Sequence, residues 1–150
     1  MEINERFETP PYGKIKGWKP IEFIEGRVTL STLVAYYRMA DLTLVSSVYD
    51  GMNLVAKEYV ASQVDGDGVL VVSHLAGAAE ELSGALVVNP YDQEGMADSI
   101  RWALEMPKNE RRERMQQMRL HLSTHDIYHW AESCLRDADM EADHFQSVSG

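Results

Sequence analysis

Three short apolar runs, separated by segments long enough for helices, constrain the fold of this chain more than any other feature. They are Leu42-Thr43-Leu44-Val45, Val69-Leu70-Val71-Val72 and Ala85-Leu86-Val87-Val88. Each run is too short for a helix and rich in strand-forming residues, and the first two are typical of strands buried on both faces. Strands that alternate with helices form a parallel sheet with helices on both sides. The sequence therefore predicts an α/β fold.

The intervening segments predict the helices. Thr29 suits the N-cap of a first helix, in which Leu30, Leu33, Val34 and Tyr37 share one face. A fourth apolar run, Ile21–Ile24, predicts an additional strand. Further helices are expected at about 53–63, 76–82, 94–105 and 108–122, and a last one, after a break at Ser123-Thr124, from Asp126 to about 139.

The length of 150 residues fits one domain. Residues 1–16 contain Pro10, Pro11 and Gly13 without periodicity and are expected to form a loose lead-in. Residues 17–140 are expected to form an incomplete Rossmann-like domain with C-terminal helices, and residues 141–150 a disordered tail.

Composition excludes several classes of protein. A formal net charge of −10 is poorly suited to nucleic acid, whose binding requires basic side chains. No apolar run approaches the roughly 18 residues needed to cross a bilayer. The single cysteine excludes an internal disulfide, and the N-terminus lacks a signal pattern, so we expect a cytoplasmic protein.

Ligands of parallel sheets bind at the carboxyl ends of the strands, which indicates the loops at 46–53, 73–77 and 89–92. In the first of these loops, the chain passes Asp50-Gly51 and enters a helix. Free amides and the helix dipole make such a helix start suitable for a phosphate. Glu58 lies one turn further along, on the same side as Leu54, where a carboxylate can accept hydrogen bonds from a ribose.

Other polar residues favour ordinary structural roles. His121, His125 and His129 are spaced by four, but the break at Ser123-Thr124 argues against a metal site, and none is predicted. His74 is expected to be a satisfied loop histidine and Lys57 a solvated helix residue, although each could instead contact a ligand. Adjacent carboxylates at Glu80-Glu81 point in different directions and do not form an acid–base pair.

The stretch Asp50-Gly51-Met52-Asn53-Leu54-Val55-Ala56-Lys57-Glu58 resembles the signature of the α,α-trehalose-phosphate synthases. Flanking motifs resemble the same family in the same order: Tyr37–Asp41, Gly68–Ser73, Ala76–Leu82, Val88–Asp92 and His125–Trp130. Val48-Tyr49 departs from the pattern, because the family usually has a leucine-arginine pair there.

This resemblance implies a two-domain GT-B glycosyltransferase with UDP-glucose bound between Rossmann-like domains. The turn Asp50, Gly51, Met52 and Asn53 would contact the donor glucose, and Leu54 and Val55 the diphosphate. Glu58 would hold the ribose, and main chain near Val28 would face the base. No cofactor or metal is implied. No complete catalytic set is expected in this chain, and Asp50 is the nearest candidate.

The implied activity transfers glucose from UDP-glucose to glucose 6-phosphate, which forms trehalose 6-phosphate with retained configuration. The resemblance covers the donor-binding part, so we expect an incomplete enzyme that meets its sugar-phosphate acceptor only when an N-terminal domain is supplied. A glucosylglycerol-phosphate synthase fragment is an alternative within the class. A non-catalytic nucleotide-sugar-binding module, which pairs with its own copies or regulates a full-length synthase, is the alternative from another class.

Overall fold

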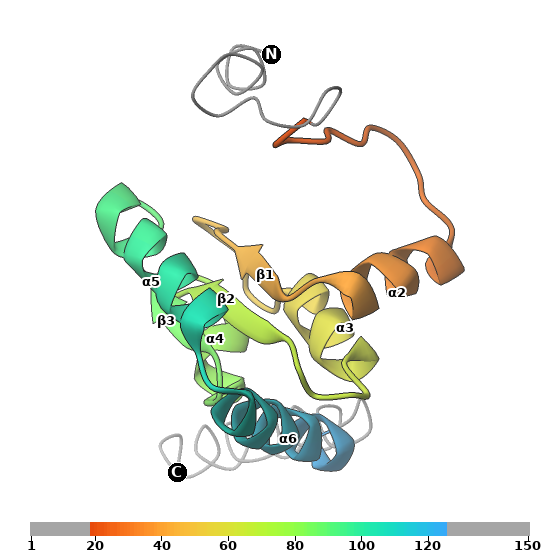
Figure 1. Cartoon of the computed structure of the whole chain (residues 1–150), viewed down its shortest axis with the longest axis vertical. Helices are drawn as coiled ribbons and strands as arrows, with labels where there is room; N and C mark the ends of the chain where they lie inside the picture. The colour runs from red at the N-terminus through yellow and green to blue at the C-terminus, as the bar shows by residue number, and fades with distance from the viewer. Residues whose placement is uncertain (1–18, 126–150) are drawn as a thin grey trace, which may run out of the picture.

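The computed structural model describes residues 19–125 of the chain (Figure 1). The predicted lead-in at 1–16, the helix expected from Asp126 and the tail at 141–150 lie outside the described residues. Strands and helices alternate along the described part, so the predicted α/β class is confirmed.

The sheet is parallel and contains β1 (Leu42–Val45), β2 (Val69–Ser73) and β3 (Leu86–Val88) in the order β1-β2-β3. Leu42 lies opposite Val69, and Val71 lies opposite Leu86. All three predicted runs are therefore strands of one sheet, and their carboxyl ends meet at one edge.

Helices precede, connect and follow the strands in the predicted order. Thr29 caps the first of them, because its side chain accepts a hydrogen bond from the Thr32 amide at 3.2 Å. The helices are α2 (Leu30–Met39), α3 (Leu54–Ser62), α4 (Ala78–Glu81), α5 (Gln93–Glu105) and α6 (Lys108–Thr124).

The central strand β2 divides the core into two layers because its side chains alternate between the faces of the sheet. Leu70 and Val72 pack on the face covered by α3, α4 and α6, together with Tyr59 and Met115. On the other face, the core cluster joins Val69 and Val71 of β2 to Ala103 of α5 and to Met106. Figure 1 shows α5 on one side of the sheet, with α3 and α6 on the other.

The strand predicted at Ile21–Ile24 does not form, and that prediction is wrong. This segment is irregular, and the side chains of Ile21 and Phe23 are 46% and 79% exposed. An apolar run becomes a strand only where a neighbouring strand and a packing surface accept it. Within residues 19–125, the sheet ends at β1 and offers this run neither.

The predicted burial of β1 on both faces is also wrong. Val45 is buried, whereas Leu44 is 38% exposed. The cause is the position of β1 at the edge of the described sheet. The helix α2 packs against α3, contributes no fully buried residue and leaves its Leu30 exposed.

The break predicted at Ser123-Thr124 comes slightly later, because α6 includes both residues, ends at Thr124 and is followed by a bend at His125. Their hydroxyls donate to the carbonyl of Leu120, so the helix itself satisfies them. Within residues 19–125, no helix has the length and apolar character required to cross a bilayer.

The buried side chain of Tyr59 makes the stability of the fold depend on pH in the alkaline range. Burial, the largest effect, raises the pKa of the Tyr59 phenol to about 12, and its hydroxyl donates to the Ala40 carbonyl at 3.3 Å. The unfolded chain loses this proton near pH 10, so the folded state binds more protons between the two pKa values. We expect the free energy of unfolding to fall by about 2 kcal/mol between roughly pH 10 and 12.

Urea unfolding across this pH range, compared between the unaltered chain and Tyr59→Phe, measures this contribution. The variant lacks the ionisable group and should lose less stability as the pH rises. Identical pH dependence of the two proteins would show that Tyr59 does not titrate as its burial requires.

Candidate functional site

The carboxyl end of β1 leads into a turn at Asp50–Asn53 that is built on one carboxylate. Oδ1 of Asp50 accepts hydrogen bonds from the amides of Met52 at 3.2 Å and Asn53 at 2.8 Å. Oδ2 accepts from Nδ2 of Asn53 at 2.8 Å. Short polar side chains of this kind fold the backbone onto themselves, so the turn is fixed by its own sequence.

Asn53 joins this turn to α3 and is 5% exposed. Its φ of 53° places it in the left-handed region, and its Oδ1 accepts from the Ala56 amide at 2.9 Å as the N-cap. Nδ2 also donates to Oγ of Ser47 at 3.2 Å. Asparagine tolerates the left-handed region and is among the best N-cap residues. One side chain therefore sets the backbone conformation, the helix start and the turn.

The start of α3 is open to a ligand. An α-helix leaves its first amides without intrahelical acceptors, and Asn53 accepts only from that of Ala56. The amides of Leu54 and Val55 therefore remain for an acceptor outside the helix. Their side chains are 59% and 46% exposed, so the surface around this helix start is accessible. The geometry suits an anionic group such as a phosphate.

A second loop supports the turn from the neighbouring strand. Asp50 pairs with Ala76 in an isolated parallel bridge, and the Gly77 amide donates to the Asp50 carbonyl at 2.9 Å. Between the two loops lies a groove of about 240 Å³. It is lined by Tyr49, Asp50, Gly51, His74, Leu75, Ala76, Gly77 and Glu80.

Two of the three loops predicted from strand order thus line one groove, whereas the loop at 89–92 does not line it. His74 connects the second groove loop to the end of β3, because its amide donates to the Val88 carbonyl at 2.9 Å. Nδ1 of the same residue lies 3.2 Å from that oxygen. His74 is therefore a satisfied loop histidine as far as Nδ1 is concerned, as the sequence predicts.

The electrostatics of the turn keep Asp50 ionised. The hydrogen bond from the Asn53 amide, which is the largest effect, lowers the pKa of the Asp50 carboxyl below its usual value. An ionised carboxylate accepts hydrogen bonds and has no proton to give. Asp50 can therefore accept bonds from hydroxyl groups in the groove, but it is unsuited to act as a general acid near neutral pH.

Glu58 lies on the exposed surface of α3, one turn beyond Leu54, as predicted. Its Oε2 accepts a hydrogen bond from the hydroxyl of Tyr37 on α2 at 3.2 Å. Burial, followed by the charge of Glu58, raises the pKa of the Tyr37 phenol above its usual value. The phenol therefore remains a neutral donor over the physiological range.

Lys57 is not the solvated residue that the sequence favours. Its Nζ lies 2.8 Å from both carboxylate oxygens of Glu81, and its side chain is only 22% exposed. The pair connects α3 to α4. Sequence spacing did not reveal it, because the two residues are 24 positions apart.

Val28 is the one predicted site residue that belongs neither to the turn nor to α3. It lies in the exposed segment immediately before Thr29 and is itself 40% exposed. Asp50, Gly51, Met52, Asn53, Leu54 and Val55 form one continuous turn and helix start, with Glu58 on the same helix.

Within residues 19–125, no cluster of three or more histidine, cysteine or acidic side chains is arranged to hold a metal ion. The rings of His121 and His125 stack at 4.1 Å, and Nε2 of His121 lies 3.8 Å from a Glu81 oxygen. His129 lies outside the described residues.

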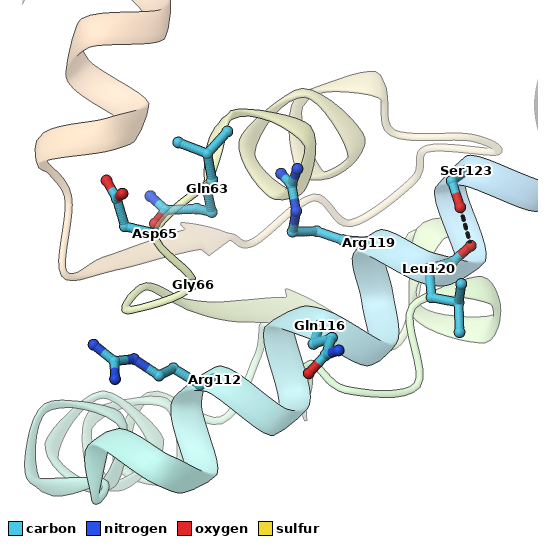
Figure 2. Close-up of a pocket in the computed structure, with 9 residues that line it drawn as sticks. Gln63, Asp65, Gly66, Arg112, Gln116, Arg119, Leu120 and Ser123 are labelled. Atoms are coloured by element: carbon cyan, nitrogen blue, oxygen red, sulfur yellow. Dashed lines mark hydrogen bonds between the residues drawn. The ribbon is translucent and has the colours of Figure 1, made fainter.

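A larger cavity of about 520 Å³ lies elsewhere, between α6 and the loop that precedes β2 (Figure 2). Arg112 and Arg119 extend from α6 toward the segment that carries Gln63 and Asp65. Arg119 donates to the carbonyls of Val60 and Ala61, at the C-terminus of α3, and Arg112 pairs with Asp67 at 2.8 Å. These guanidinium groups stabilise the packing of α6. This cavity is therefore not the candidate site.

Several residues of the site escape sequence reasoning. Gly77, Glu80 and Tyr49 line the groove, and Tyr37 contacts Glu58, yet none of the four was predicted as a ligand contact. Tyr37, Gly77 and Glu80 lie in the flanking motifs, and Tyr49 lies in a candidate loop. The rule for carboxyl ends of strands indicates the loop that contains Gly77. Only the packing of α2 on α3 brings Tyr37 to the site.

Comparison with known proteins identifies a family. The model of glycosyltransferase family 20 matches residues 1–140. A trehalose-6-phosphate synthase of Sodalis glossinidius is 45% identical over 144 residues, which cover 91% of this chain and 30% of that protein. The chain therefore spans about a third of the length of such relatives.

Solved structures agree in fold. A structure from E. coli bound with UDP-2-fluoro glucose has a TM-score of 0.80 at 42% identity, over 91% of this chain and 29% of that one. An α,α-trehalose-phosphate synthase (UDP-forming) from Burkholderia xenovorans, in complex with glucose-6-phosphate, has a TM-score of 0.81 at 43% identity, over 91% and 29%. The sheet and its helices are thus part of the α/β architecture of these GT-B enzymes.

Proposed function

This chain belongs to glycosyltransferase family 20, and on that premise we propose that it is the donor-binding part of a retaining glucosyltransferase. The donor is UDP-glucose, the acceptor is glucose 6-phosphate and the product is trehalose 6-phosphate. Relatives named trehalose-6-phosphate synthase, and similar structures with a UDP-sugar analogue or glucose-6-phosphate bound, support this reaction. Because the chain spans about a third of these relatives, the proposal assigns only donor contacts to it.

The observation that carries the proposal is the helix start of α3 beside the groove. The amides of Leu54 and Val55 would bind the diphosphate, where the positive end of the helix dipole adds to their effect. Asp50, with Gly51, Met52 and Asn53, would contact the hydroxyls of the glucose. Glu58 would accept from the ribose, and main chain near Val28 would face the base.

The chemistry of such a site is electrostatic. As the bond between the anomeric carbon and the phosphate oxygen breaks, UDP leaves with the bonding electron pair. A hydroxyl oxygen of the acceptor forms the new bond to that carbon and gives up its proton. Negative charge then grows on the phosphate that faces the start of α3. Fixed amide dipoles stabilise growing charge without having to reorganise. Asp50, kept ionised by the turn, would hold the sugar in place without supplying a proton.

Replacement of Glu58 tests the donor site. We expect Glu58→Ala to weaken UDP-glucose binding about tenfold or more, because a hydrogen bond to a charged group contributes roughly 1.5–3 kcal/mol. Stability should change little, because Glu58 is exposed. Calorimetric titration of the chain with UDP-glucose, and with ADP-glucose for comparison, measures the affinity.

Glu105→Ala is the matched control, since it removes the same charge from an exposed position on α5. It should leave the affinity unchanged. Equal affinity of Glu58→Ala and the unaltered chain would exclude Glu58 from the donor site, and no binding by the folded, unaltered chain would refute the proposed donor site in this chain.

A further inference from the structure

The carboxylate of Glu58 on α3 is held by a side chain of the neighbouring helix α2. The hydrogen bond from Tyr37 connects two helices across 21 positions of sequence. The neighbouring cations do not compete for Glu58, because Arg38 pairs with Asp65 at 2.9 Å and Lys57 pairs with Glu81 at 2.8 Å. Among the described side chains, the one that donates a hydrogen bond to the Glu58 carboxylate is Tyr37.

Two contacts fix the position of Tyr37 while α2 is docked, although α2 has no fully buried residue. Its ring meets that of Tyr59 edge to face, with centroids 6.0 Å apart and an interplanar angle of 77°. Tyr59 is completely buried. On the main-chain side, Nε2 of Gln63 donates to the Tyr37 carbonyl. A continuous chain of contacts therefore runs from the core through the Tyr37 hydroxyl to the carboxylate.

The bond occupies only one oxygen of Glu58. A carboxylate offers about four acceptor positions, so Oε1 and the second lone pair of Oε2 remain for a ligand. A glutamate without this bond would sample several rotamers and would have to be ordered when the ligand binds. A side chain ordered in advance reduces that cost and strengthens binding.

From these contacts we infer that Tyr37 is a positioning residue that sets the Glu58 carboxylate for the ribose hydroxyls and thereby sharpens the choice of ribose over deoxyribose. The inference rests on the proposed donor site. It concerns a residue on a different helix, whose hydroxyl acts through Glu58 and does not itself meet the nucleotide.

Tyr37→Phe removes the hydroxyl and keeps the ring that packs on Tyr59. We expect UDP-glucose to bind about three- to tenfold more weakly, the range that corresponds to one lost hydrogen bond. The analogue with 2′-deoxyribose has one hydroxyl fewer for Glu58, so Tyr37→Phe should reduce its affinity by a smaller factor. The ratio of the affinity for UDP-glucose to that for the deoxyribose analogue, measured by calorimetry on the full chain, should therefore fall.

Tyr36→Phe is the matched control, because Tyr36 is the adjacent residue of α2 and its side chain is 47% exposed. It should change neither affinity. In a Glu58→Ala background, Tyr37→Phe should have no further effect, because residues that act through one contact are not additive. Thermal unfolding of each variant verifies that the comparison is between folded proteins.

The outcomes separate this inference from the proposed function. If Glu58→Ala weakens binding but Tyr37→Phe leaves the ribose-to-deoxyribose ratio unchanged, the inference is overturned and the donor site stands. An equal loss for both nucleotides has the same meaning, because Tyr37 would then affect binding by a route other than the ribose. If UDP-glucose does not bind the unaltered chain, or binds regardless of Glu58, the donor site and this inference fall together.

Discussion

Gly77→Ala is expected to abolish measurable binding of UDP-glucose while the sheet remains folded. A Cβ atom at Gly77 would lie 2.0 Å from the carbonyl oxygen of Gly51 and 2.8 Å from its carbonyl carbon. Both are backbone atoms, so no side chain can swing away to relieve the contact. The turn at Asp50–Asn53 must move instead. A shift of about 1 Å can cost on the order of 100-fold in the rate of a reaction that depends on positioning, and we expect a comparable loss of affinity here.

Stability should also fall, by about 1–3 kcal/mol, as is usual for overpacking. The change would break the hydrogen bond from the Gly77 amide to the Asp50 carbonyl. Calorimetric titration measures the affinity, and chemical denaturation measures the stability.

Gly51→Ala is the matched comparison on the opposite side of the same contact, because a Cβ there meets nothing within 4 Å. It should leave the stability unchanged, so any loss of affinity would report contact with the ligand itself. Full affinity and stability of Gly77→Ala would contradict the role of the second loop in supporting the turn.

The second large effect is expected at Asn53. We expect Asn53→Ala to lower the free energy of unfolding by about 2–3 kcal/mol. The left-handed backbone costs alanine roughly 1–2 kcal/mol, and loss of the N-cap costs about 1 kcal/mol. Affinity for UDP-glucose should fall as well, because the amides of Leu54 and Val55 would no longer be held in place.

Asn53→Gly separates the two causes, since glycine adopts the left-handed region without strain but cannot cap through a side chain. It should be more stable than Asn53→Ala by about 1 kcal/mol or more. Denaturant unfolding of both variants provides the comparison. If the two were equally stable, the φ of 53° at this position would carry no energetic cost.

The sequence predicts much of this fold because its short-range signals agree with the final packing. The three apolar runs became strands, and Thr29 and Asn53 start helices as N-caps. The rule that ligands bind at carboxyl ends of strands indicated three loops, of which two line one groove. These features depend on neighbouring residues and on a general property of parallel sheets.

What the sequence could not predict depends on neighbours that are distant along the chain. Ile21–Ile24 has the pattern of a strand but no strand to pair with in the described sheet. Lys57 has the pattern of a surface residue, yet Glu81 lies 2.8 Å away. The contact of Tyr37 with Glu58 likewise depends on how α2 lies against α3. The periodicity of a sequence indicates which residues share a face of a helix, but it does not indicate which other element packs against that face.

The exposed position of α2 has a consequence for the kinetics of the site. A helix that lacks fully buried residues is among the elements that detach first in local unfolding, at a free energy well below that of the whole domain. Because Tyr37 travels with α2, detachment would release the Glu58 carboxylate while α3 and the sheet stayed intact. The protein would thus alternate between a state with α2 docked, in which Tyr37 orders Glu58, and a state with α2 detached. A nucleotide that binds the docked state more tightly would shift the population toward it.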